Sequence, residues 1–138
     1  MKHSKLMIAV ALLVLVAPLA AQTGAVQATI PFGFIVQQTK LPAGEYRVIV
    51  ERTKLRLIRI DTRGIGCFGL FNYIHPGPDQ GVTPKLIFNR YGSRYFLAEV
   101  WTGNGNSGEK LSISSAEREY ARATKPASTT VLARQVSK

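Results

Sequence analysis

Cys67 and His75 are the side chains best suited to act as a nucleophile and its base. Beyond the first 21 residues the chain has one cysteine and one histidine, eight positions apart. Thiol catalysis needs a base within hydrogen-bond reach and a third group that orients the base. Asp79 follows in the same segment and could orient His75. The favoured interpretation is a buried Cys67 and a solvated His75, with a Cys-dependent enzyme as an alternative.

Metal binding and acid–base catalysis need several convergent ligands or a close pair of carboxylates. The carboxylates here are scattered, at Asp61, Asp79, Glu99 and in two glutamates of a predicted helix. The segment GNGNSG, residues 103–108, has glycines but no following lysine or helix start, so it does not match a phosphate-binding loop. The sequence therefore predicts no metal, no cofactor and no catalytic residue.

Basic side chains cluster in one predicted hairpin, at Arg47, Arg52, Lys54, Arg56, Arg59 and Arg63. We expect Arg47, Arg56 and Arg59 to share its outer face, where they could bind a polyanion with salt-dependent affinity. The alternative is a solvated sheet face that discourages pairing with other strands.

Aromatic residues recur in or beside most predicted strands, and the simplest interpretation is that they form the core. The alternative is a pocket for an apolar ligand inside a small barrel. Its candidate lining residues are Phe71, Tyr73, Phe88 and Trp101.

The elements that position these side chains are mostly strands. Every even position from Val26 to Val36 is apolar, which predicts one strand with one buried face. Pro31 and Gly33 fall on the other face and favour an edge strand or a bulge near the middle. Leu41-Pro42-Ala43-Gly44 has the composition of a turn, so a second strand is expected over 45–51.

The next hairpin is expected to place Val50 opposite Leu55 and Val48 opposite Leu57. A four-residue loop is favoured over a two-residue loop, because Arg52-Thr53 suits no tight hairpin turn. Leu55 and Leu57 occupy odd positions, whereas the next apolar residues, Ile58 and Ile60, occupy even positions. This change predicts a bulge after Leu57 that keeps Arg56 and Arg59 in water.

Residues 65–74 have apolar side chains at both odd and even positions, as in a strand covered on both sides. A Pro- and Gly-rich loop, 75–84, leads to a hairpin over 85–102 with a three-residue loop around Gly92. Ser114 lies three positions before Glu117, which predicts a capped helix over 115–123. A last strand is expected over 129–134. The fold class is all-β, a single antiparallel sandwich or small barrel of about seven strands with one short C-terminal helix.

The first residues have the pattern of a secretory signal peptide. A basic start precedes an apolar segment over 6–20, which is shorter than a membrane-spanning helix. We expect residues 1–21 to be the signal peptide and 22–138 to form one β domain, either periplasmic or extracellular. An uncleaved N-terminal anchor is the alternative. The mature domain is expected to have no transmembrane segment, and with one cysteine it has no internal disulfide.

The whole chain carries 18 Lys+Arg against 8 Asp+Glu, a formal net charge of +10. Export makes nucleic acid an improbable partner. The polyanions that an exported protein meets are anionic polysaccharides and lipid surfaces of the cell envelope. Alternatively, the charge keeps the domain soluble.

Four segments together resemble a group of small secreted, β-rich proteins of unknown function from soil-dwelling bacteria. The segments are IPFGFIV, LPAGEYRV, LIFNRYGSRYFLAEVW and SSAEREYA, and the resemblance covers residues 26–122. It implies export and a β-rich fold, and it implies no chemistry.

Together these observations predict an exported, non-enzymatic domain that binds an unknown envelope component. A carrier of an apolar ligand and, less favoured, a Cys-dependent enzyme are the alternatives.

Overall fold

The structure is a computed structural model, and it describes residues 24–51, 54–59, 65–69, 71–74, 83–103 and 108–136. A five-stranded sheet has the order β12 (Arg134–Gln135), β1 (Gly24–Ile30), β4 (Gly44–Glu51), β5 (Lys54–Arg59) and β6 (Ile65–Gly69). A seven-stranded sheet has the order β11 (Ala127–Leu132), β8 (Lys85–Tyr91), β9 (Arg94–Trp101), β10 (Gly108–Leu111) and β7 (Phe71–Ile74). In this second sheet β2 (Phe34–Val36) pairs with β9 in parallel and with β3 (Thr39–Leu41).

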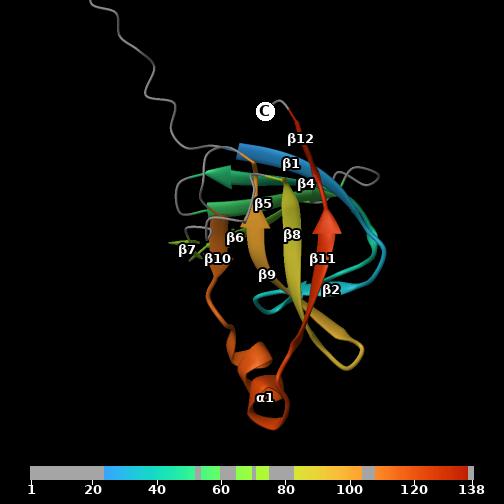
Figure 1. The fold of residues 1–138 in the computed structure, drawn as a ribbon, viewed down its shortest axis with the longest axis vertical. Helices are drawn as coiled ribbons and strands as arrows, with labels where there is room; N and C mark the ends of the chain where they lie inside the picture. Colours follow the sequence, from blue (N-terminus) through green and yellow to red (C-terminus); the bar gives the residue numbers. More distant parts are fainter. Residues whose placement is uncertain are drawn as a thin grey trace, which may run out of the picture.

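The two sheets pack face to face around one core, and the strands of one sheet run across those of the other (Figure 1). Both sheets contribute fully buried apolar side chains, among them Val26, Val48, Leu57, Leu86, Phe88 and Val100. The fold is therefore an all-β sandwich with one short helix. The described residues form more strands than the expected seven, because the chain repeatedly passes from one sheet to the other.

The first such passage is at residues 31–33. The expected single strand is two strands, because the ladder of β1 ends at Ile30 and Phe34 begins β2 in the other sheet. Pro31 has no N–H to donate to a ladder, which suits this break. The expected buried face is confirmed, since Val26, Ile30 and Phe34 lie in the core.

The β4–β5 hairpin has the expected register, with Val50 opposite Leu55 and Val48 opposite Leu57. Its loop is shorter than expected, because Glu51 pairs with Lys54. The expected bulge after Leu57 is wrong, since pairing continues without interruption to Arg59.

The β8–β9 hairpin turns on Gly92 and Ser93, so its loop has two residues instead of the expected three. Gly92 has a φ of 62°, which confirms the expected left-handed glycine. The irregularity in this hairpin lies within the strands, where pairing shifts between Ile87 and Phe88 and leaves Ala98 without a partner.

Two further expected strands are also divided between the sheets. The segment expected over 65–74 forms β6 in one sheet and β7 in the other. The final strand is likewise divided at Ala133 into β11 and β12. Both segments therefore contribute one strand to each sheet.

The helix α1 (Ser115–Ala123) matches the expected range, and the Ser114 side chain accepts a hydrogen bond from the Glu117 N–H. It lies at the lower end of the molecule, beside the β8–β9 hairpin (Figure 1). Ala116 and Tyr120 pack there against Tyr91 and Phe96 on the outer face of the seven-stranded sheet.

Candidate ligand-binding face

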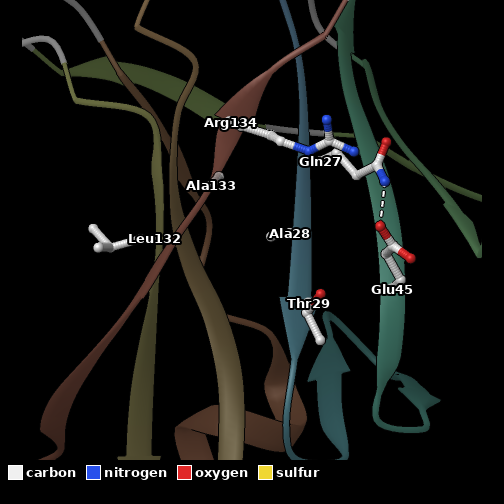
Figure 2. Close-up of a pocket in the computed structure, with 7 residues that line it drawn as sticks. All are labelled: Gln27, Ala28, Thr29, Glu45, Leu132, Ala133 and Arg134. Carbon is white, nitrogen blue, oxygen red and sulfur yellow. Dashed lines mark hydrogen bonds between the residues drawn. The ribbon is translucent and has the colours of Figure 1, made fainter.

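A groove opens on the outer side of the sandwich between β1 and the segment that joins β11 to β12 (Figure 2). Its volume is about 280 Å³. The lining residues are Gln27, Ala28, Thr29, Glu45, Leu132, Ala133 and Arg134.

The groove exists because β12 is short. Gln27 pairs with Arg134, but at Ala133 the chain turns away to join the other sheet, where the Ala133 N–H donates to the Pro84 carbonyl. The Val136 N–H donates to the Ala25 carbonyl, so the backbone groups of Ala25 face β12. Because alternate residues of a strand face the same neighbour, the backbone groups of Gln27 and Thr29 face this side as well. Thr29 is therefore the first residue of β1 whose backbone groups face this side without a described strand opposite.

A row of polar side chains runs across the outer face of the five-stranded sheet, and two of its members, Gln27 and Arg134, line the groove. Arg134, Gln27 and Arg47 are register neighbours on three adjacent strands, so they share one face of the five-stranded sheet. Figure 2 shows the Arg134 side chain extending toward Gln27. The Gln27 amide donates to Glu45 Oε1, which fixes that carboxylate at the side of the groove.

Arg47 is the buried end of this row. Its Nε atom is buried and has no hydrogen-bond acceptor. Within the described part of the chain, neither Arg47 nor Arg134 forms an ion pair. A buried donor without a partner is unfavourable. Arg47 as a whole is partly exposed, so an anionic group could contact the accessible part of its guanidinium group.

The other two arginines of the predicted basic face differ from Arg47. Arg56 is opposite Ile49 on the outer face, and its Nη1 lies 3.7 Å from Glu51 Oε1, so its charge is partly offset. Arg59 is opposite Tyr46, a core residue, and does not share the outer face with Arg47 and Arg56. The expectation that all three arginines share the outer face is therefore wrong for Arg59, because β5 contains no bulge that would turn its side chain to that face. Arg134, which the sequence did not suggest, takes its place.

The candidate apolar pocket is not supported for the two members whose side chains the structure describes. Phe88 is fully buried between the sheets, with its ring centroid 5.5 Å from that of Phe34. Trp101 pairs with Lys85 on the opposite face of the same sheet, where its Nε1 donates to Glu99 Oε2 at 2.9 Å. These two rings therefore line no common cavity. The side chains of Phe71 and Tyr73 lie outside the described residues.

The Cys–His hypothesis is not resolved by the described residues. Cys67 lies in β6 as the register partner of Arg56, and nothing further is described of its side chain. His75 and Asp79 fall outside the described ranges. Among the described residues, no group of three His, Cys, Asp or Glu side chains is placed to hold a metal ion.

Two buried glutamates were not predicted as special. Glu109, 5% exposed, is opposite the core residue Val100, and its Oε2 has no hydrogen-bond partner. Burial raises the pKa of this carboxyl from 4.5 to about 7. Glu117, 4% exposed, accepts hydrogen bonds from Asn89 and Tyr91 beneath the helix. Neither lies in the groove, and only the capping spacing before Glu117 was visible in the sequence.

Comparison of the chain with protein-family models, with curated proteins and with solved structures found no match. Within the described residues, no helix has the length and apolar character needed to cross a bilayer. The fold and the groove define the molecule as a β-sandwich domain with a basic, grooved sheet face.

Proposed function

We propose that this protein is an exported, non-enzymatic binding domain whose ligand is an acidic polysaccharide of the cell envelope or its surroundings. The observation that carries the proposal is the row formed by Arg134, Gln27 and Arg47. It combines two arginines outside any described ion pair with a buried Arg47 Nε that has no acceptor. Export rests on the apolar segment over 6–20 and its basic start.

The lining of the groove favours a polysaccharide over a lipid surface. Gln27 and Thr29 offer amide and hydroxyl groups, and Glu45 can accept hydrogen bonds from sugar hydroxyls. The carboxylates of an acidic sugar would pair with the guanidinium groups at the upper end. Glu45 would repel a dense layer of lipid phosphates, whereas a polymer chain can place hydroxyls beside it.

The proposal is tested by isothermal titration calorimetry with polygalacturonate as the acidic probe and dextran as the neutral one. We expect binding to polygalacturonate that weakens with added salt, and no binding to dextran. Arg134→Glu and Arg47→Gln should each weaken binding roughly tenfold, since each removes one close charge contact.

The matched control is Arg118→Glu, which makes the same charge change as Arg134→Glu on an exposed position of α1. Equal losses from Arg118→Glu and Arg134→Glu would mean that only net charge matters, and would refute the groove as the site. Tight binding to phosphatidylglycerol vesicles without binding to polygalacturonate would refute the polysaccharide as the ligand.

A further inference from the structure

The free edge of β11 differs from the other sheet edges described. Of the five described strands that pair with only one other strand, β11 is the longest, with six residues against two in β12, five in β6, four in β7 and three in β3. Exposed edge strands usually carry a charge, a proline or a bulge that prevents further pairing. Residues 127–132, ASTTVL, contain no charged residue and no proline, and they pair with β8 without a register shift.

The backbone of β11 presents a regular set of unpaired groups. The Ala133 N–H donates to Pro84, so Val131 and Thr129 also direct their backbone groups toward β8. Ser128, Thr130 and Leu132 therefore direct theirs toward the free edge. All three are exposed, and Leu132, at 70%, is the more exposed of the two large apolar side chains that stand out on the described surface.

We infer that β11 pairs with β11 of a second copy of this chain, antiparallel about a two-fold axis at Thr130. This register places Thr130 opposite its own copy and Ser128 opposite Leu132 of the other copy. All three pairs then use backbone groups that face the edge, and each pair exchanges two hydrogen bonds. The seven-stranded sheets of the two copies become one continuous sheet.

The side chains of β11 fit the same register. Thr129 and Val131 are half-buried toward the core side of the sheet, and the two-fold axis brings Thr129 of one copy opposite Val131 of the other. β-branched residues opposite one another are favourable in antiparallel pairs. Leu132 gains a neighbour in Ser128 of the other copy. A second copy fits this edge because the strand complements itself in backbone and in side chains, and a closed two-fold contact ends at a dimer.

Electrostatics oppose this association and provide a test of it. Each full-length chain carries a formal net charge of +10, which becomes +8 without Lys2 and Lys5 of the expected signal peptide, and Lys125 and Arg134 are exposed at the two ends of the edge. Salt screens repulsion between like charges. Dimerisation should therefore strengthen as salt is added, whereas polysaccharide binding at the groove should weaken.

The experiment is sedimentation velocity of the purified protein over a range of concentrations and salt, with Cys67→Ser as the background to exclude disulfide dimers. We expect a monomer–dimer equilibrium. Thr130→Pro removes the N–H at the centre of the contact without removing a bond to β8, and should weaken dimerisation about tenfold or more. Thr130→Val keeps that N–H and is the matched control. Leu132→Lys adds a charge to the edge and should also give monomers.

Cysteine pairs test the register directly. In the Cys67→Ser background, Thr130→Cys should form a disulfide-linked dimer, because the two Cα atoms would lie about 5.5 Å apart across the axis. Ser128→Cys should not, because its two copies would be separated by roughly four residues along the strands.

A monomer at every concentration and salt level, or a dimer unchanged by Leu132→Lys, would overturn the inference, as would equal crosslinking by the two cysteine variants. If Thr130→Pro does not fold, as judged by circular dichroism, Leu132→Lys and the cysteine pair decide. The dimer and the polysaccharide site fail separately. Ser128→Lys also adds a charge to the edge, at a residue that does not line the groove, so this variant should be monomeric and still bind polygalacturonate.

Discussion

The Tyr91 hydroxyl donates a hydrogen bond of 3.1 Å to Oε1 of Glu117, which joins the β8–β9 hairpin to the helix. Asn89 Nδ2 donates to the same oxygen at 2.8 Å. Burial, together with the nearby Glu117 charge, raises the pKa of Tyr91 to about 12. One carboxylate therefore holds two strand side chains and the first turn of α1 in place.

Replacing Glu117 with alanine is expected to destabilise the domain by about 2–3 kcal/mol, because Asn89 and Tyr91 would both lose their acceptor. Urea unfolding followed by circular dichroism measures this change. Glu119→Ala is the control, since that carboxylate is exposed and pairs only with Arg122 across 3.4 Å. A surface pair of this kind contributes less than about 1 kcal/mol. Equal effects of the two substitutions would contradict the role given to Glu117.

Glu109 should make stability depend on pH. Its pKa is about 7 in the folded protein against an ordinary value of 4.5 for an exposed glutamate, so the folded state binds the proton more tightly. Stability from the protonated carboxyl is therefore fully present below about pH 4.5 and is lost as pH rises through about 7. The loss is at most about 3 kcal/mol.

Urea midpoints measured across this range should fall more steeply with pH in the wild type than in Glu109→Gln, which cannot titrate. Glu119→Gln, at an exposed position, should retain the wild-type slope. A wild-type slope in Glu109→Gln would show that the pH dependence has another source.

Gly108 lies against the indole of Trp101. A Cβ atom built on Gly108 would be 2.6 Å from the ring, and this ring cannot swing aside as a flexible side chain would. Gly108→Ala should therefore destabilise the domain by about 1–3 kcal/mol and shift the tryptophan fluorescence. Gly33→Ala is the matched control, because the nearest atom to its Cβ is Leu41 O at 3.6 Å, an ordinary contact. Similar losses from both variants would refute the steric explanation.

The Tyr46 hydroxyl donates a hydrogen bond of 2.7 Å to the Pro42 carbonyl, four residues earlier. This bond ties the turn before β4 to a ring that is buried in the core. Tyr46→Phe keeps the ring and removes the hydroxyl, and should cost about 1–2 kcal/mol in thermal or urea unfolding. Tyr95→Phe, at a half-buried position for which no hydroxyl bond is described, should change stability less. A larger loss in Tyr95→Phe would contradict this assignment.

Local patterns predicted local structure well. Ser114 and Glu117 predicted the helix and its cap, and the parity of Val48, Val50, Leu55 and Leu57 predicted the β4–β5 register. These features depend on dihedral preferences and on neighbours within a few positions, which a single sequence displays.

Predictions that depended on the partner of a strand were less successful. Alternation is the same in both sheets, so it could not show that the chain changes sheets at Pro31 or at Ala133. Arg59 was assigned to the wrong face because the apolar Ile58 suggested a bulge that the ladder does not contain. Phe88 and Trp101 were grouped by type, although they lie on opposite faces of one sheet.

The sequence by itself determined that this chain forms amphipathic strands, a capped helix and a strongly basic domain, because periodicity, capping and charge are properties of neighbouring residues or of simple sums. Only the tertiary structure decided that Arg134 lies beside Gln27 and Arg47, and that β11 has an uncharged free edge. Those features arise from strand pairing between distant segments. The choice of partner is made by core packing over the whole sandwich, which period-two alternation does not specify.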